Sequence, residues 1–320
     1  MSIITGLHHV TVNSGDPQEN IDFYVGVLGL RLVKRSVNQD APDTYHLFFA
    51  DGAGSPGTEL TFFPWRDLPR GQDGTGMTSE VALAVPAASL DYWESRLTAA
   101  GVANIGRATR FGEPLLTLRD PHGLALALVG IAEPREFVPW ADSAVPEAHQ
   151  IRGLHAIRMA EARLEATEQF LVTGLGFAKV GEEQGWHRYV VAGGGSGRIV
   201  DVHVPAGASR GFVGTGSVHH VAFRVDDDAA ELAARQQVRA AGAQPTPVID
   251  RYWFKSVYFR EPGGALFEIA TDGPGFTVDE DVSSLGERLV LPPFLEPHRA
   301  EIERGLQPVT VPGARAPTAA

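Results

Sequence analysis

The sequence predicts an α+β protein built from four βαβββ modules, which form two domains of paired, curved mixed sheets. Three observations predict this fold. The chain repeats itself internally, each repeat alternates strands with one amphipathic helix, and 320 residues suffice for roughly two ordinary domains. Hydrophobic residues make up 43% of the chain, so an extensive buried core is expected.

The internal repeats give the order of the modules. Residues 6–12 (GLHHVTV) recur as residues 153–159 (GLHAIRM) at an offset of 147. A second motif, SEVALAV at 79–85, resembles HHVAFRV at 219–225. Two motifs that each occur twice, in alternation, divide the chain into modules A, B, A′ and B′.

Each module is expected to open with a short strand of alternating or β-branched residues, followed by a helix and three more strands. The amphipathic helices are predicted at 17–27, 88–100, 164–173 and 227–241. In module B′ the later strands are predicted at 246–249, 255–260 and 265–270, with a hairpin turn at 261–264 before the last one.

The Pro-containing segment 132–150 is typical of a linker between domains. We therefore expect an N-terminal domain of modules A and B over 1–145 and a C-terminal domain of modules A′ and B′ over 150–275. Residues 276–320 lie outside the repeats and are expected to form a C-terminal extension with a helix near 296–305.

Composition excludes several classes of function. The net charge of −12 would repel phosphate backbones and anionic lipid, so neither nucleic acid nor a membrane surface is an expected partner. The chain has no cysteine, which excludes disulfides, thiolate nucleophiles and iron–sulfur clusters, and leaves nitrogen and oxygen ligands for any metal. No secretory signal and no apolar run long enough to span a bilayer is present, so a cytoplasmic protein is expected.

The first strand carries two adjacent histidines, and strand alternation distinguishes them. Successive side chains of a strand point to opposite faces of its sheet. If Val10 and Val12 pack on the helix, His9 and Thr11 face the concave side, while His8 shares the valine face. His9 is therefore the candidate metal ligand of module A.

The same alternation in module B′ places His220 and Glu268 on the concave side, with His219 on the helix side and Tyr258 facing the concave side from the neighbouring strand. A carboxylate among apolar residues is costly to bury unless it is paired or coordinated. Two imidazoles and one carboxylate that leave coordination positions open form the facial triad that suits non-haem Fe(II).

The other two modules do not repeat this set. The equivalent positions hold Ala156, Ala127 and Glu80, which cannot reproduce two imidazoles and a carboxylate. The sequence thus predicts one metal site, completed from modules A and B′, and no equivalent site between modules B and A′.

The motifs GLHHVTV, GSVHHVAFRV and REPGGALFEIAT together resemble the vicinal oxygen chelate superfamily, over about residues 1–300. Within it the arrangement resembles ring-cleaving dioxygenases of the hydroquinone-cleaving type, including chlorohydroquinone 1,2-dioxygenases. The resemblance implies that iron is held by His9, His220 and Glu268. Catechol extradiol enzymes differ, because they take all three ligands from the second half, where this chain has Ala156.

The resemblance also implies further site residues. Tyr258 and Arg251 match the group's pocket tyrosine and arginine, and with His219 they are the expected catalytic residues. His8 and Thr11 are the expected substrate-binding residues beside the ligands. The implied activity is Fe(II)-dependent cleavage of a hydroquinone-type diol with incorporation of both atoms of O2, and Mn(II) is the alternative metal. The implied partners are a small aromatic diol and O2. The protein could also form a homo-oligomer.

Two other functions fit the same fold. A metal-dependent isomerase or lyase of the glyoxalase type would use Lewis-acid chemistry and usually has four protein ligands, of which the sequence offers three. A metal-free binding protein, like the antibiotic-resistance members, would leave the two histidines and the glutamate without a role. Fold resemblance alone does not choose among these functions.

Overall fold

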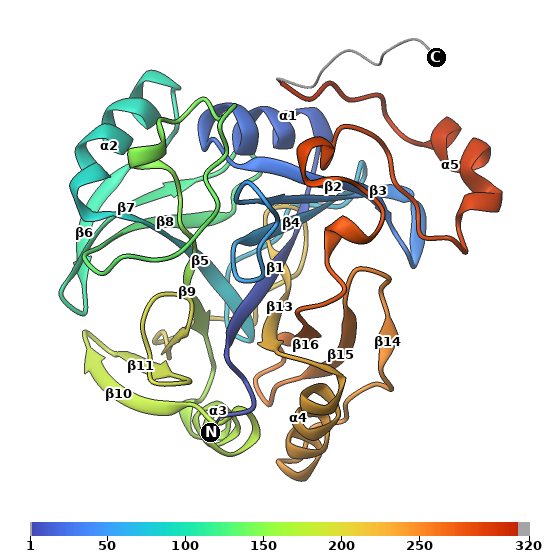
Figure 1. The fold of residues 1–320 in the computed structure, drawn as a ribbon. Helices are drawn as coiled ribbons and strands as arrows, with labels where there is room; N and C mark the ends of the chain where they lie inside the picture. The colour runs from blue at the N-terminus through green and yellow to red at the C-terminus, as the bar shows by residue number, and fades with distance from the viewer. Residues whose placement is uncertain (1, 313–320) are drawn as a thin grey trace.

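The computed structural model describes residues 2–312 and places them in two curved, eight-stranded sheets. In Figure 1 the sheet that contains β1 lies on the right and the sheet that contains β5 on the left. The predicted C-terminal extension, 276–320, is described as far as residue 312, and residues 313–320 lie outside the described residues.

Each repeat has the predicted βαβββ order. Module A consists of β1 (Gly6–Ser14), α1 (Pro17–Ile21) continued by the π-helix η1 (Asp22–Val27), β2 (Arg31–Asn38), β3 (Ala41–Ala50) and β4 (Glu59–Pro64). Module B consists of β5 (Met77–Pro86), η2 (Ala87–Ser89), α2 (Leu90–Ala99), β6 (Gly106–Arg110), β7 (Glu113–Arg119) and β8 (Ala125–Ile131). After the short turn η3 (Glu147–His149), module A′ consists of β9 (Gly153–Ala160), α3 (Leu164–Leu175), β10 (Ala178–Glu183), β11 (Trp186–Val190) and β12 (Ile199–His203). Module B′ consists of β13 (Val218–Val225), α4 (Asp228–Ala240), β14 (Ile249–Asp250), β15 (Lys255–Arg260) and β16 (Leu266–Thr271).

The sheets join modules from different halves of the chain. One sheet has the strand order β14-β15-β16-β13-β1-β4-β3-β2, so module A pairs with module B′. The other has the order β10-β11-β12-β9-β5-β8-β7-β6, so module B pairs with module A′. This pairing brings the two ends of the repeat region together in one sheet. The division of the chain into domains 1–145 and 150–275 stays a prediction.

Helices cover the convex faces of both sheets, α1 and α2 at the top of Figure 1 and α3 and α4 at the bottom. Val10 and Phe223 point from β1 and β13 into the apolar core beneath them and are fully buried. Burying a side chain of this size stabilises the fold by about 1.5–3 kcal/mol. In α4, Ala234 and Val238 face this core, and Asp227 caps the helix by accepting from the backbone N–H of Ala230.

The pairing of β1 with β13 contains two β-bulges. Leu7 pairs with Phe223 and His9 with Ala222, so His8 is an extra residue in β1. In the same way Thr11 pairs with His220 and Val12 with Val218, so His219 is an extra residue in β13. A bulge redirects the side chain of the extra residue. The expectation from strict alternation that His8 and His219 face the helices is therefore wrong.

The C-terminal extension packs across the concave side of the β1 sheet. It contains the short helical turns η4 (Phe276–Val278), η5 (Val282–Ser284) and η6 (Glu296–His298), and the helix α5 (Arg299–Gly305). Three apolar side chains of the extension, Phe276, Leu285 and Val290, belong to one buried cluster. The same cluster contains Phe48 of β3 and Trp253, which lies between β14 and β15. Because this segment fills part of the concavity, only a limited cavity remains above the predicted metal ligands.

Lys34 of β2 anchors this extension. Its ammonium group is fully buried, lies 2.6 Å from a carboxylate oxygen of Asp279 and makes a short contact with the Glu280 carboxylate. The indole N–H of Trp253 donates to the other Asp279 oxygen at 2.9 Å. The ion pair therefore ties the extension to β2 and fixes Trp253 at the same time. Among residues 2–312, no helix is both long and apolar enough to cross a membrane.

Candidate metal centre

Three side chains predicted as metal ligands converge on the concave side of the β1 sheet. The Nε2 atoms of His9 and His220 lie 3.2 Å apart, and they lie 3.3 and 2.9 Å, respectively, from Oε2 of Glu268. The three residues come from the adjacent strands β1, β13 and β16, and all are buried. Sequence alternation thus placed these three side chains on the correct face.

The two extra histidines of the bulges contact the two candidate ligands. Nδ1 of His8 lies 2.9 Å from Nδ1 of His9, and Nδ1 of His219 lies 2.8 Å from Nδ1 of His220. One nitrogen of each pair must carry the hydrogen. If His9 and His220 carry it on Nδ1, their Nε2 lone pairs face each other and Glu268, as metal ligation requires.

Burial makes the extra histidines poor bases. Burial, followed by the neighbouring His9, lowers the pKa of His8 to about 3. Burial, followed by His220, lowers the pKa of His219 to about 3. Both side chains are therefore neutral near pH 7, and a neutral imidazole has the acceptor nitrogen that the Nδ1 contact needs.

Glu268 is ionised in this environment. Burial alone would raise its pKa, but the His9 and His220 imidazoles outweigh burial and hold the pKa of Glu268 well below its usual range. Its Oε1 accepts a hydrogen bond from Ser256 Oγ at 2.5 Å. Its Oε2 is buried and makes no hydrogen bond with residues 2–312. When both imidazoles carry their hydrogen on Nδ1, the oxygen that faces the two Nε2 atoms has no protein donor.

The donor set fits a divalent transition metal. Two Nε2 lone pairs and a carboxylate oxygen within 3.3 Å of one another repel unless a proton or a cation lies among them. Two imidazoles and one carboxylate are the ligand types of a non-haem Fe(II) triad with open positions. His9, His220 and Glu268 would hold such an ion.

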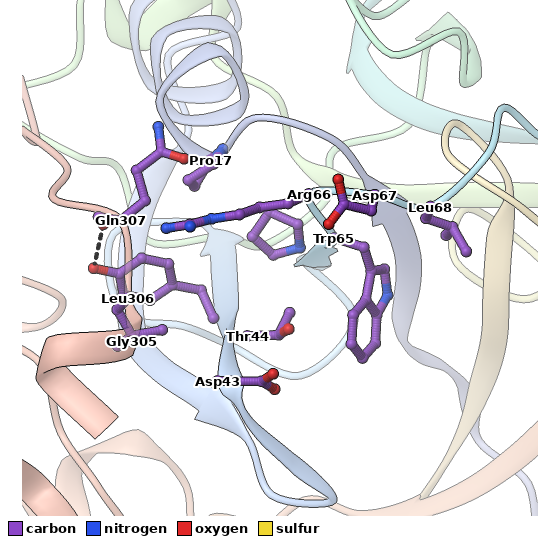
Figure 2. A pocket seen from close by; sticks show the side chains of 12 residues that line it. Pro17, Asp43, Thr44, Trp65, Arg66, Asp67, Leu68, Gly305, Leu306 and Gln307 are labelled. Carbon is purple, nitrogen blue, oxygen red and sulfur yellow. Dashed lines mark hydrogen bonds between the residues drawn. The ribbon is translucent and has the colours of Figure 1, made fainter. Parts of the chain in front are cut away.

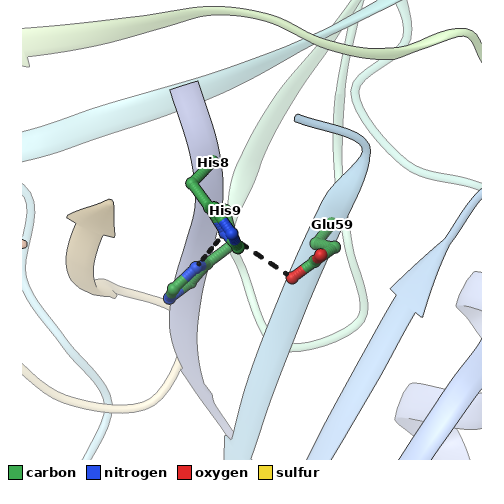
Figure 3. Close-up of side chains that lie close together, drawn as sticks. All are labelled: His8, His9 and Glu59. Atoms are coloured by element: carbon green, nitrogen blue, oxygen red, sulfur yellow. Dashed lines mark hydrogen bonds and ion pairs between the residues drawn. The ribbon is translucent and has the colours of Figure 1, made fainter. Parts of the chain in front are cut away.

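A second group of metal-ligating types lies beside the first. Figure 3 shows His8 and His9 on β1 next to Glu59 on β4. Nδ1 of His8 is 3.9 Å from Oε2 of Glu59, and burial raises the pKa of Glu59 well above its usual value, with Asp51 as the next cause. A neutral carboxyl group and an engaged Nδ1 are poor ligands, so we interpret this group as support for His9.

A cavity of about 340 Å³ opens above the triad. Most of its apolar lining is aromatic: Phe48, Phe63, Trp65, Trp253 and Phe254. His9 and His220 lie at its surface, together with the predicted residues His219, Arg251 and Tyr258. The size and lining suit one small aromatic ring with a few polar substituents.

Arg251 and Tyr258 form one polar wall of the cavity. The guanidinium of Arg251 lies 5.4 Å from the centre of the Tyr258 ring and donates to Asp40 at 2.9 Å. Burial, with Glu268 as the next cause, raises the pKa of Tyr258 above its usual value, so its phenol is neutral. Tyr252, between Arg251 and Trp253, has a φ of 74°, a strained conformation of the kind that gathers at functional sites.

Thr11 was expected to bind substrate, but it does not line the cavity. It is fully buried, and its hydroxyl lies 2.7 Å from that of Thr61. Thr61 in turn lies 3.0 Å from Nε2 of His46, which does line the cavity. Sequence reasoning missed His46, because a single histidine in a strand carries no repeat signal. The sequence indicates only that His46 and Phe48, two residues apart in one strand, share a face of the sheet.

A neighbouring cavity of about 370 Å³ adjoins the first. Trp65 lines both, and its indole N–H donates to Asn13 at 2.9 Å. Figure 2 shows Trp65 and Asp67 on one side of this second cavity, Gln307 of the C-terminal extension on the other, and the Arg66 side chain extending between them. Trp65 thus lies between the cavity above the triad and this second cavity.

The β5 sheet lacks an equivalent triad in the residues that the structure describes. Glu80, at the position of His220, pairs with Arg110, and Ala127 and Ala156 pack in a small apolar cluster. His155 occupies the bulge that corresponds to His8 and lies 3.2 Å from Glu113. Salt bridges and alanines therefore stand in this sheet at the positions of the candidate ligands.

Comparison with known proteins agrees with the fold. The model of the Glyoxalase/Bleomycin resistance protein/Dioxygenase superfamily matches residues 6–128 and 153–269. A crystal structure of a "putative dioxygenase" from Bacillus subtilis subsp. subtilis str. 168 superposes with a TM-score of 0.92 at 41% identity, over 97% of this chain and 99% of that chain. Glyoxalase I from Zea mays shares the fold, with a TM-score of 0.62 at 15% identity over 83% of this chain and 92% of that chain.

Two relatives extend over nearly the whole chain. The protein named "Putative ring-cleaving dioxygenase MhqO" of Bacillus subtilis (strain 168) is 43% identical over 96% of this chain and 97% of its own length. The chlorohydroquinone/hydroquinone 1,2-dioxygenase of Sphingobium indicum is 33% identical over 94% of this chain and 95% of its own length. The chain therefore belongs to the Glyoxalase/Bleomycin resistance protein/Dioxygenase superfamily.

Proposed function

We propose that this protein is an Fe(II)-dependent ring-cleaving dioxygenase that opens a hydroquinone-type aromatic diol with O2 and incorporates both oxygen atoms. The observation that carries the proposal is the convergence of His9, His220 and Glu268 beneath an aromatic-lined cavity. The dioxygenase names of two full-length relatives support the same reaction class. A cytoplasmic location and a homo-oligomer stay predictions.

The three ligands leave room for two exogenous groups. His9, His220 and Glu268 would hold a ferrous ion, which would supply open coordination positions and a path for electrons between the diol and O2. Mn(II) has similar ligand preferences and is the alternative metal. The buried carboxylate of Glu268 is ionised and offsets part of the charge of a divalent ion.

The remaining polar residues position the diol and its protons. The ring centres of Tyr258 and His220 are 5.6 Å apart. The neutral phenol of Tyr258 can therefore donate a hydrogen bond to a phenolate oxygen that lies near His220. His219 presents a neutral imidazole to the same cavity; because its pKa is lowered to about 3, it can form a hydrogen bond with the diol but is a poor proton acceptor. Arg251 stays charged and can stabilise anionic oxygen that develops during ring opening.

The aromatic walls serve two purposes. Phe254 packs 5.2 Å from the His9 ring, and Trp253 closes the side that the C-terminal extension covers. These walls offer faces on which a planar ring can stack. They also keep water from the reacting centre, where electrostatic interactions are stronger in a low-dielectric environment.

The glyoxalase-type alternative expects a fourth protein ligand. Among residues 2–312, the group around Glu268 contains two histidines and one glutamate. Three ligands with open positions favour oxygen chemistry over the four-ligand arrangement. The metal-free binding alternative would leave the buried Glu268 Oε2 without a partner.

The test is reconstitution of the protein with Fe(II) under anaerobic conditions, followed by oxygen-uptake measurements. Hydroquinone, chlorohydroquinone, methylhydroquinone and catechol are offered in turn, with Mn(II)-loaded protein in parallel. We expect one O2 consumed per hydroquinone and a ring-opened product. His9→Ala is expected to lose uptake, whereas His155→Ala, at a bulge of the other sheet, keeps it.

Two results would contradict the proposal. Uptake with catechol alone would reject the hydroquinone class. Uptake with none of the four diols, by protein that carries stoichiometric Fe(II), would reject the dioxygenase itself.

A further inference from the structure

A polar side chain with no assigned role lies on the wall of the metal cavity opposite Tyr258. The strand order β15-β16-β13-β1-β4-β3 places Tyr258 on one side of the triad and His46 on the other. Both residues line the same cavity. His46 stands on β3, two strands from His9 on β1, and neighbouring strands are about 4.8 Å apart.

The His46 ring is held in a fixed position. It packs against Phe48 and Phe63, with ring centres 3.8 and 4.5 Å away. Its Nε2 lies 3.0 Å from the Thr61 hydroxyl, which lies 2.7 Å from the buried Thr11 hydroxyl. Two aromatic contacts and a chain of two hydroxyl groups therefore orient one edge of the ring.

The other edge of the ring is free for a ligand. Nδ1 of His46 makes no hydrogen bond with any other residue in the described range 2–312. Burial, followed by His9 and His220, lowers the pKa of His46 well below its usual value, so the ring is neutral. With one nitrogen engaged by Thr61, Nδ1 is a donor or an acceptor, depending on the tautomer. A hydroxyl group matches either state.

We propose that His46 is a specificity-determining residue that binds, through Nδ1, the hydroxyl of the aromatic diol that lies away from the metal ligands. This inference rests on the proposed function and deepens it, because it names the arrangement of the two hydroxyls. The two oxygens of a 1,4-diol lie at opposite ends of the ring and can reach both His46 and the triad. The vicinal oxygens of a catechol lie at one end and leave His46 without a partner.

The same cavity offers a reason for this preference. Beside His46, the aromatic side chains on this wall are Phe48, Phe63 and Trp65, which offer no acceptor and, apart from the indole N–H that Trp65 donates to Asn13, no donor. The polar residues Asn38, Gln39 and Asp40 line the cavity from the turn before β3, but their side chains already make hydrogen bonds within the protein. Burying a hydroxyl without a partner is unfavourable, so a 1,4-diol needs a polar group at this end. His46 is the ring on this wall that can supply it.

The experiment compares two ligands in two variants of the metal-loaded protein. Dissociation constants for hydroquinone and phenol, which lacks the second hydroxyl, are measured anaerobically on the Fe(II) protein by quenching of tryptophan fluorescence. We expect the wild type to prefer hydroquinone about ten-fold, the usual worth of one hydrogen bond. In His46→Phe this preference should fall to about two-fold or less, while phenol binds as before.

Kinetic measurements separate binding from a general structural effect. In oxygen uptake with hydroquinone, His46→Phe should raise KM about ten-fold and leave kcat within about three-fold. His46→Gln keeps a donor and an acceptor and should restore part of the preference. Thr61→Val keeps the His46 ring and removes its anchor, and should give an intermediate loss. If His46→Phe does not fold, the last two variants carry the test.

The outcomes distinguish this inference from the proposed function. If the wild type turns over hydroquinone and His46→Phe keeps the ten-fold preference, His46 does not bind the second hydroxyl and only this inference fails. If His46→Phe loses phenol and hydroquinone binding equally, its role is structural and the inference also fails. If iron-loaded wild type consumes no O2 with any diol, the proposed function and this inference fail together.

Discussion

The replacement of His8 by alanine tests how the β-bulge supports the metal centre. His8 is not in the triad, but its Nδ1 lies 2.9 Å from Nδ1 of His9 and is the hydrogen-bond partner of that ligand. Loss of such a partner typically weakens metal affinity 10–100-fold, which corresponds to about 1.4–2.8 kcal/mol. The His8 ring also packs 5.4 Å from Phe254, so His9 would lose support from a second direction.

The chain supplies a matched control. His155 occupies the corresponding bulge in β9, is equally buried, and precedes Ala156 where His8 precedes His9. His155→Ala should therefore remove similar packing in a sheet that holds no triad. Metal affinity is measured by competition between protein and a chelator for Fe(II) under anaerobic conditions, and folding stability by urea denaturation of the metal-free proteins.

We expect a 10–100-fold loss of affinity for His8→Ala, no loss for His155→Ala, and comparable losses of stability for both. Equal affinity losses in the two variants would mean that general destabilisation is the cause. Wild-type affinity in His8→Ala would refute the supporting role. Complete loss in His8→Ala, combined with retained affinity in Glu268→Gln, would place the metal among His8, His9 and Glu59 instead.

Three further predictions concern the buried ion pair of the C-terminal extension, the buried carboxyl group of Glu161 after β9, and Tyr258 of the cavity. Lys34→Met leaves the buried Glu280 carboxylate without its partner and should lower the free energy of unfolding in urea by about 3–5 kcal/mol, whereas Lys255→Met, at an exposed ion pair, should change it by less than about 1 kcal/mol. Equal effects would contradict the burial argument. Burial, followed by the charge of Glu261, raises the pKa of Glu161 from 4.5 to about 8. The unfolded chain therefore releases this proton at a lower pH than the folded protein does. The free energy of unfolding should fall as the pH rises from about 4.5 to 8. Glu161→Gln should therefore be more stable than the wild type at pH 9, by an amount of the order of 5 kcal/mol, and similar at pH 5 in thermal or urea unfolding; an unchanged pH profile would contradict this. Tyr258→Phe should lower kcat/KM for hydroquinone by about 100-fold with unchanged iron content, and a wild-type rate would exclude Tyr258 from proton transfer.

The repeats explain why the candidate ligands occur in one sheet and not at the equivalent positions of the other. Both sheets have the same strand order within their modules and the same bulges, at His8 and His219 in one and at His155 and Ser79 in the other. The scaffold is thus present twice. In the β5 sheet, Glu80 is paired with Arg110, and the ligand positions otherwise hold alanine. The difference between the sheets therefore lies in a few side chains rather than in the backbone.

Local patterns in the sequence were sufficient for much of the site. Alternation within β1, β13 and β16 depends only on the period of a strand, and it placed His9, His220 and Glu268 on the concave face. The same reasoning failed for His8 and His219, because a bulge arises from the pairing of two strands about 200 residues apart and not from either strand alone.

The sequence by itself determined the four βαβββ modules and placed the two histidines and the glutamate that are the candidate ligands in modules A and B′. Only the tertiary structure decided what surrounds them. The pairing of β1 with β13 created the bulges, β3 brought His46 into the cavity, and the Lys34 ion pair fixed the C-terminal extension across the concave face. The physical reason is range: periodicity and repeats are local properties of the chain, whereas the cavity wall consists of side chains from distant segments that meet only when the sheet closes around them.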